Sequence, residues 1–264
     1  MIDCKKIAKE RKERLKNYIR ENNWTGKLAA IQVGDDPASN AYIRGKRKDC
    51  EEVGIEFELS WHSENVTDDI LINDILRLNL DNNVKGVIVQ LPLPTHLSRD
   101  KILSYIRPNK DVDGFFSYSP FTPCTPKAVM TILEELGVDV DGKVCCVVGR
   151  GMVGKPMVDI LTKNNATVFW ANSHTPHDML MSMVAYSDIV ITATGVAGLF
   201  KDPLIGRDQL VIDVGITRGE DGCLYGDVDK SCYSNLRHIT PVPGGVGLMT
   251  RVALLENVVY GGNR

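Results

Sequence analysis

The stretch Lys143–Pro156, KVCCVVGRGMVGKP, decides the fold. Its first half is an apolar run rich in valine, which is typical of a strand buried in a parallel sheet. Gly149, Gly151 and Gly154 follow at once in the pattern G-x-G-x-x-G, before a segment compatible with a helix. In a dinucleotide-binding turn these glycines permit the tight turn, let the backbone approach a pyrophosphate, and let the helix pack on its strand. The sequence therefore predicts a dinucleotide site, with a glycine-rich turn in another kind of α/β protein as the alternative.

Strand and helix patterns alternate on both sides of this stretch. Helices are expected at 3–22, 39–53, 67–78, 98–105, 125–136, 156–164 and 249–260, strands at 27–33, 55–61, 84–90, 143–148, 166–170, 189–193 and 210–214, and a small hairpin at 222–226. Ser39 is the expected N-cap of the second helix, and Gly54 its expected end. The alternation predicts an α/β fold with parallel sheets. An irregular, proline-rich segment after Pro108 indicates a domain boundary, which we place at residue 120.

Composition excludes several classes of protein. The 264 residues are 43% hydrophobic and 25% charged with a net charge of −3, which is ordinary for a globular protein and gives no reason to expect nucleic acid or a membrane as partner. No apolar run has the length of a membrane span, and the basic N-terminus lacks the apolar core of a signal peptide. The seven cysteines include no C-x-x-C pair, so we expect thiols in a reducing cytoplasm and no metal site.

Three polar side chains of the first hundred residues are candidates for a ligand site, and the amine of Lys46 is the one that could act as a general acid or base. Tyr42 and Lys46 are four residues apart on a predicted helix and so share one face. Gln90 ends a predicted buried strand, where ligand sites of α/β sheets lie, and could offer its amide to a ligand or to the Lys46 amine. A surface lysine over an aromatic ring, and a polar strand end, are the structural alternatives.

Two carboxylates follow in an irregular loop. Asp111 and Asp113 precede Gly114, and an ionised carboxylate accepts two hydrogen bonds well from one planar donor pair, such as a pterin or guanine edge. An Asx turn is the alternative interpretation.

The second nucleotide strand ends at Trp170 and leads into Asn172, Ser173 and His174. NAD enzymes usually carry Asp or Glu at this place for the ribose hydroxyls, and none is present. Arg150 and Ser173 could instead hold a ribose phosphate, which favours NADP and leaves NAD possible.

Several motifs follow one another along the chain. They are Pro37-Ala38-Ser39…Tyr42…Lys46, Val89-Gln90-Leu91-Pro92-Leu93-Pro94, Lys110-Asp111-Val112-Asp113-Gly114-Phe115, Pro123-Cys124-Thr125-Pro126, the glycine turn, Ile212-Asp213-Val214-Gly215-Ile216, and Pro241-Val242-Pro243-Gly244-Gly245-Val246-Gly247. In this order, over nearly the whole chain, they resemble the bifunctional methylenetetrahydrofolate dehydrogenase/methenyltetrahydrofolate cyclohydrolase family.

The resemblance implies a fold, two activities and a set of site residues. It implies a catalytic, folate-binding domain of residues 1–120 plus 249–264, a Rossmann-type NAD(P)-binding domain of residues 121–248, a cleft between them that holds a tetrahydrofolate derivative, and a homodimer. Lys46 would be the catalytic amine, Gln90 would tune it, Tyr42 would pack on the folate and Asp113 would hold the pterin edge. Substrate contacts would come from Tyr42, Lys46, Val89, Gln90, Leu91, Asp113, Pro243, Gly244 and Gly245, and cofactor contacts from Gly149, Arg150, Gly151, Met152, Val153, Gly154, Ser173, Thr194, Gly195, Val214, Gly215 and Ile216.

The chain departs from the family pattern at the glycine turn, which is one residue shorter, and in a shortened loop after Phe115. A changed cofactor preference is one alternative that these departures leave open. Others are a dehydrogenase with weak or lost cyclohydrolase activity, and a binding protein without catalysis.

Overall fold

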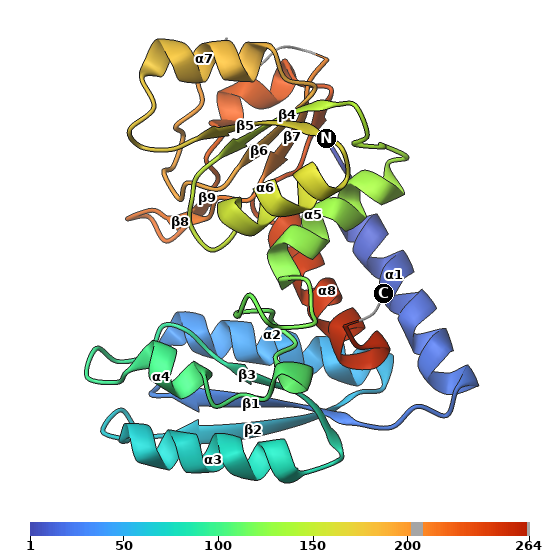
Figure 1. Cartoon of the computed structure of the whole chain (residues 1–264), viewed down its shortest axis with the longest axis vertical. Helices are drawn as coiled ribbons and strands as arrows, with labels where there is room; N and C mark the ends of the chain where they lie inside the picture. The colour runs from blue at the N-terminus through green and yellow to red at the C-terminus, as the bar shows by residue number, and fades with distance from the viewer. Residues whose placement is uncertain (202–207, 263–264) are drawn as a thin grey trace. The chain divides into compact units, whose positions relative to one another are not determined.

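A computed structural model of the chain describes residues 1–201 and 208–262. The helices are α1 (Cys4–Glu21), α2 (Pro37–Val53), α3 (Asp68–Leu80), α4 (Arg99–Leu103), α5 (Cys124–Glu135), α6 (Gly154–Lys163), α7 (His177–Ala185) and α8 (Val246–Tyr260), with 3-10 turns η1 (Pro108–Lys110) and η2 (Lys230–Ser234). The strands are β1 (Lys27–Val33), β2 (Glu56–His62), β3 (Val84–Val89), β4 (Val144–Val148), β5 (Thr167–Ala171), β6 (Ile189–Thr192), β7 (Leu210–Asp213), β8 (Thr217–Arg218), β9 (Leu224–Tyr225) and β10 (His238–Ile239). The predicted α/β class is confirmed, and Figure 1 shows the order of the elements.

The chain divides into two compact units. The first-sheet unit consists of Glu10–Cys124 and Arg251–Arg264, and the second-sheet unit of Met1–Lys9 and Thr125–Thr250. Residues 1–9, which are expected in the domain of residues 1–120, group with the second-sheet unit. There the buried Ile2 donates its backbone N–H to the carbonyl of Ile239 in β10 at 2.9 Å.

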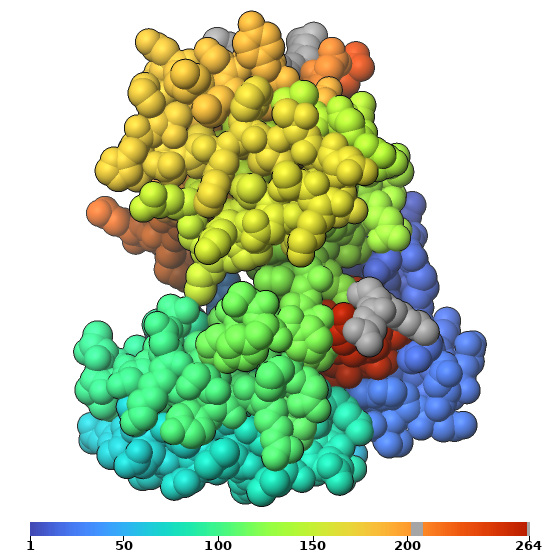
Figure 2. Space-filling model, viewed as in Figure 1, coloured from blue at the N-terminus to red at the C-terminus, as the bar shows by residue number. Residues whose placement is uncertain are grey.

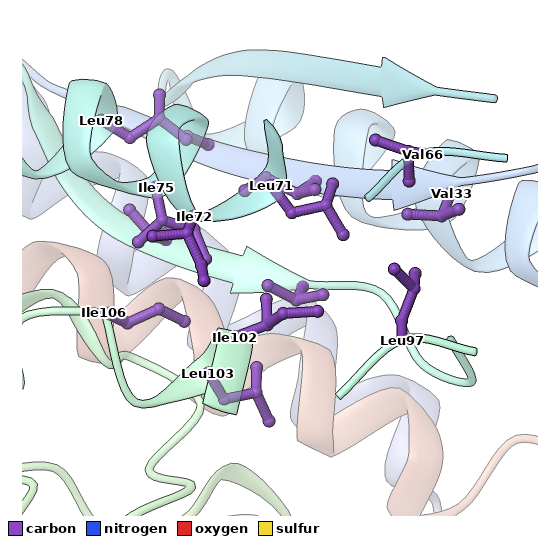
Figure 3. Close-up of a cluster of buried hydrophobic side chains, with 14 of the residues drawn as sticks. Val33, Val66, Leu71, Ile72, Ile75, Leu78, Leu97, Ile102, Leu103 and Ile106 are labelled. Atoms are coloured by element: carbon purple, nitrogen blue, oxygen red, sulfur yellow. The ribbon is translucent and has the colours of Figure 1, made fainter. Parts of the chain in front are cut away.

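The first-sheet unit contains three parallel strands in the order β2-β1-β3. One face of the sheet carries a cluster of buried aliphatic side chains. Figure 3 shows Leu71, Ile75 and Leu78 of α3 on one side of this cluster, and Ile102 of α4 with Ile106, three residues after α4, on the other. Each such side chain contributes about 1.5–3 kcal/mol on burial, so together they hold α3 and α4 on the sheet.

The second-sheet unit contains five parallel strands in the order β10-β7-β6-β4-β5. Helices α6 and α7 lie on opposite sides of this sheet (Figure 1) and form yellow and gold outer surfaces in the space-filling view (Figure 2). The strand order reverses direction at β4, since β5 lies on one side of it and β6 on the other. Ligands of open α/β sheets bind beyond the carboxyl ends of the strands at such a switch point, and the glycine turn begins there.

Several predicted element ends are wrong by two or three residues. Helix α2 begins at Pro37, and its N-cap is Asp36, whose carboxylate accepts the N–H of Ser39 at 2.7 Å; Ser39 is therefore not the cap. Proline is favoured in a first turn because its missing N–H has no helical partner there. Gly54 ends α2 in the left-handed conformation as expected. The hairpin pairs β8 with β9, so its second strand lies within the predicted 222–226 and its first strand lies before it. Strand β10 is too short to show a pattern in the sequence.

No helix within the described ranges is both long and apolar enough to span a membrane.

Lys110 supports the first-sheet unit through a buried ammonium group. Its Nζ donates to the carbonyl oxygens of Leu78 (2.8 Å), Asn79 (2.9 Å) and Asp81 (2.8 Å), which lie at the C-terminal end of α3. Burial lowers the pKa of Lys110, while the charge of nearby Asp81 opposes this effect. The three carbonyl acceptors also favour the charged ammonium form.

Lys110→Met should destabilise the protein by about 2–3 kcal/mol, because it leaves buried carbonyl oxygens without a donor. Urea denaturation followed by far-UV circular dichroism measures the change. Lys85→Met is the control, since Lys85 donates one exposed bond to the carbonyl of Asn82 and its loss should cost little. Equal stability of the Lys110→Met and Lys85→Met variants would contradict this role for Lys110.

Candidate functional site

Lys46 and Gln90 contact each other in the first-sheet unit. Lys46 lies on α2, Gln90 directly follows β3, and the Lys46 Nζ donates to the Gln90 Oε1 at 3.1 Å. The Gln90 Nε2 donates to the carbonyl of Leu91 at 2.8 Å, and its backbone N–H donates to Ile31 at 2.8 Å. The Gln90 amide is thus held with its oxygen toward the amine. One of the amine's three N–H donors is occupied, and the lysine is oriented at the carboxyl edge of the sheet.

Tyr42 and Val89 differ in what they can offer a ligand. The Tyr42 side chain is 47% exposed, one helical turn before Lys46, so its ring is available on the same face of α2. The Val89 side chain is buried in the aliphatic cluster, while Leu91 is half-buried. Any ligand contact by Val89 would therefore involve its backbone.

The two carboxylates of the irregular loop have separate roles. Asp111 is fully buried and accepts the backbone N–H groups of Phe115 (3.2 Å) and Phe116 (3.3 Å), which makes it a turn-forming residue. Burial raises the pKa of Asp111 despite these bonds. Asp113 is half-buried, and its carboxylate has no hydrogen-bond partner among residues 1–201 and 208–262. Asp113 is therefore the carboxylate that can accept a donor pair from a ligand.

The three glycines of the turn after β4 differ in their surroundings. A Cβ on Gly149 would overlap the carbonyl oxygen of Ala193, and a Cβ on Gly154 would overlap the carbonyl oxygen of Gly149. Gly149 also has a φ of +119°, which L side chains rarely adopt. Gly151 is exposed and faces open space. Two glycines are thus required for packing, and the middle one leaves the backbone accessible to a phosphate.

The neighbours of the turn fit a dinucleotide. The Trp170 Nε1 of β5 donates to the Gly149 carbonyl at 2.8 Å and ties the turn to the neighbouring strand. Arg150, Met152 and Ser173 are exposed, and Val153 is half-buried. Asn172 accepts the N–H of His174 at 2.9 Å in an Asx turn, so it shapes the loop that presents Ser173.

The loops after β6 and β7 carry Thr194, Gly195, Val214, Gly215 and Ile216, of which Gly195 and Ile216 are exposed. The residues Pro243, Gly244 and Gly245 belong to the same unit. Gly245 is buried where a Cβ would overlap the carbonyl oxygen of Pro241, and Pro243 is exposed. The share of these three residues in a folate site stays a prediction.

Sequence reasoning missed a pair of buried carboxylates next to these loops. Asp213 accepts the Thr192 hydroxyl at 3.1 Å and the backbone N–H groups of Asp227 (3.1 Å) and Val228 (2.9 Å). Asp227 in turn accepts N–H groups from the loop after β6. The two residues are 14 positions apart with no shared motif, and only the motif around Asp213 drew attention to either.

Two family models match the chain. The model "Tetrahydrofolate dehydrogenase/cyclohydrolase, catalytic domain" matches residues 2–113, and "Tetrahydrofolate dehydrogenase/cyclohydrolase, NAD(P)-binding domain" matches residues 123–264. The bifunctional protein FolD of Agathobacter rectalis is 43% identical, with 98% of this chain and 97% of the relative aligned.

Solved structures give the same result. The bifunctional FolD methylenetetrahydrofolate dehydrogenase/cyclohydrolase of Campylobacter jejuni superposes with a TM-score of 0.93 at 38% identity, covering 99% of this chain and 97% of that one. The Trypanosoma brucei dehydrogenase-cyclohydrolase, solved with NADP and an inhibitor, has a TM-score of 0.85 at 35% identity and covers 97% and 93% of the two chains.

Asp213 should make stability depend on pH. Burial raises its pKa from 3.8 to about 6, more than its hydrogen bonds lower it, and the charge of Asp227 adds to the rise. The folded state therefore binds the proton more tightly than the unfolded state, and the resulting stabilisation is fully present below about pH 4. This stabilisation is lost as the pH rises from about 4 through 6. A shift of two units corresponds to up to about 3 kcal/mol.

Asp213→Asn removes this titration. The free energy of unfolding of the unsubstituted protein, minus that of the variant, should fall between pH 4 and pH 7, as measured by urea denaturation at each pH. Since all other groups cancel in the difference, a flat profile would show that Asp213 does not titrate in this range.

Proposed function

The chain belongs to the tetrahydrofolate dehydrogenase/cyclohydrolase family, and we propose on that basis that it catalyses two consecutive reactions of folate one-carbon chemistry. It oxidises methylenetetrahydrofolate to methenyltetrahydrofolate with NADP, and it hydrolyses the methenyl form to formyltetrahydrofolate. The observation that carries the proposal is the hydrogen bond from Lys46 to Gln90, in a chain that also holds a glycine turn at the switch point of a parallel sheet.

The first-sheet unit supplies the folate-binding groups in this proposal. The half-exposed ring of Tyr42 packs on the folate, and the Asp113 carboxylate accepts the planar donor pair of the pterin. Both contacts orient the substrate, which is what the oxidation requires, because loss of hydride from the bridging carbon produces a conjugated cation without acid–base help.

The hydrolysis needs proton transfer, and Lys46 is the group proposed to provide it. Water adds to the methenyl carbon and loses a proton, which leaves a hydroxyl on that carbon. The bond from the carbon to one ring nitrogen then breaks as the hydroxyl loses its own proton and becomes the formyl carbonyl. Of the two protons lost, one ends on the departing nitrogen and the other is released. The Lys46 amine can pass a proton between these positions, and Gln90 holds it in one orientation. Such a group typically accelerates a reaction about 10²–10⁴-fold.

The second-sheet unit binds the dinucleotide in this proposal. NADP, when bound, supplies the hydride acceptor. The open backbone at Gly151 takes the pyrophosphate, with α6 directing its positive end toward it, and the exposed Arg150 and Ser173 hold the ribose phosphate. The absence of an acidic residue directly after β5 favours NADP over NAD.

A homodimer and a cytoplasmic location complete the proposal. The strand β2 is an edge of its sheet, and its Trp61 is 50% exposed, so this edge can pair with a second copy. Six of the seven cysteines are buried thiols, which suits a reducing compartment.

Lys46→Ala should reduce hydrolysis of methenyltetrahydrofolate by about 10²–10⁴-fold, because the proton-transferring amine is lost. The decay of the methenyl absorbance measures this rate. NADP reduction with methylenetetrahydrofolate should persist, with accumulation of the methenyl product. Lys48→Ala is the matched control, as Lys48 is exposed on the same helix and should leave both rates unchanged. Unchanged hydrolysis in Lys46→Ala would refute the assignment of the lysine.

Light scattering after gel filtration should give a mass twice that of the 29.2 kDa monomer. Trp61→Lys should shift the protein toward the monomer, since an edge lysine opposes strand pairing. Tyr186→Lys, at a residue that is 78% exposed in the other unit, is the control and should leave the mass unchanged. A monomeric unsubstituted protein would reject the dimer, and an unaltered Trp61→Lys dimer would reject the β2 edge.

A further inference from the structure

Asp227 is a fully buried carboxylate that the proposed chemistry does not use. Its Oδ2 accepts the backbone N–H of Thr194 at 2.7 Å, and its Oδ1 accepts the N–H of Val196 at 3.1 Å. Both N–H groups belong to the loop after β6. One carboxylate therefore fixes both sides of the exposed Gly195.

The loop after β7 packs on the same carboxylate. Gly215 is buried so closely against Asp227 that a Cβ would overlap the carboxylate oxygens. The Thr217 hydroxyl donates to the carbonyl of Gly195 at 2.8 Å and links the two loops a second time. The close contact of Gly215 with the Asp227 carboxylate, together with the hydrogen bond from Thr217 to Gly195, sets the distance between the loop after β6 and the loop after β7.

Asp227 is itself held in place from both sides. Its backbone N–H donates to the Asp213 Oδ1 at 3.1 Å, and its carbonyl accepts the N–H of Phe200 at 3.0 Å. The position of the carboxylate is thus determined by β7, through Asp213, and by the segment that contains Phe200. It acts as a rigid support rather than as a mobile surface charge.

We propose that Asp227 is a positioning residue of the dinucleotide site, whose carboxylate holds the loops after β6 and β7 in the conformation that receives NADP. The inference rests on the proposed function and deepens it, since Thr194, Gly195 and Val214–Ile216 are the predicted cofactor contacts of these loops. Ordering a loop residue costs about 1–2 kcal/mol of conformational entropy, so loops that are held beforehand bind more tightly.

Two acceptor oxygens are needed for this task. Asparagine in place of Asp227 has one carbonyl oxygen, and its NH₂ group would face the second backbone N–H. Asp227→Asn should therefore release one side of the Gly195 loop and weaken NADP binding by roughly 10-fold or more. The KM for NADP should rise more than kcat falls.

The experiment measures the dissociation constant of NADP by isothermal titration calorimetry, and cyclohydrolase turnover without dinucleotide on the same samples. Asp227→Asn should lose NADP affinity while methenyltetrahydrofolate hydrolysis stays within about twofold of the unsubstituted rate. Thr217→Val, at a partly exposed position, removes the cross-link alone and should weaken NADP binding by roughly 2–10-fold. Asp221→Asn is the matched control, because this exposed carboxylate accepts bonds within its own hairpin, from the Cys223 N–H and the Tyr225 hydroxyl.

The outcomes separate the inference from the proposed function. If the unsubstituted protein does not bind NADP, the proposed cofactor site is wrong. If it binds NADP and the Asp227→Asn and Thr217→Val variants bind it equally well, the positioning role is refuted. If Asp227→Asn does not fold, as loss of both activities would show, Thr217→Val decides: weaker NADP binding with intact hydrolysis supports the role, and unchanged binding refutes it.

Discussion

Backbone N–H groups in the partly buried loops beyond regular elements need hydrogen-bond acceptors, and this constraint applies in both units. The sheet hydrogen bonds stop at the strand ends, while the loops beyond them stay partly buried. Asp227 supplies the acceptors for the loop beyond β6, Asp213 supplies them for the segment after β9, and Asp111 does so for the loop after η1. At the end of α3 the need is reversed, and the Lys110 ammonium supplies donors to carbonyl oxygens. Buried charge is thus used where the regular backbone pairing ends.

This use of charge separates structural from chemical residues in similar surroundings. Asp111 and Asp113 are two residues apart, but only Asp113 keeps its carboxylate available. Lys46 and Lys110 are both partly or fully withdrawn from water, but Lys110 uses its N–H groups on three carbonyls and Lys46 gives one to Gln90. The residues that have spare hydrogen-bonding capacity are the ones assigned to the ligands.

The sequence predicts the fold class and most elements, because these depend on short-range patterns. It also predicts the Lys46–Gln90 contact across 44 residues, because Gln90 ends a strand and both residues belong to motifs of the family. Hydrophobic runs mark the strands, and ligand groups gather where strands end. The hydrophobic pattern could not identify Asp227 as the acceptor that holds the loop after β6. Its partners Thr194 and Val196 are about thirty residues away and show no periodicity. The N-cap of α2 was misplaced because Asp36, Ser39 and a first-turn proline all fit the same motif. Residues 1–9 group with the second-sheet unit, where Ile2 pairs with Ile239. No local pattern in the sequence predicts this long-range contact.

Neither unit is a continuous segment of chain, because the boundary is crossed after Lys9, after Cys124 and again after Thr250. Arg11 pairs with Glu256 at 2.8 Å, and the Asn257 side chain donates to the carbonyl of Val112 at 2.8 Å, so the first-sheet unit is completed by the last helix. During synthesis at about 5–20 residues per second, its three strands emerge well before these partners exist. The second-sheet unit likewise contains Met1–Lys9, which are synthesised well before residues 125–250 of the same unit. The first-sheet unit therefore cannot be completed until residues 125–250, which belong to the second-sheet unit, have also been synthesised.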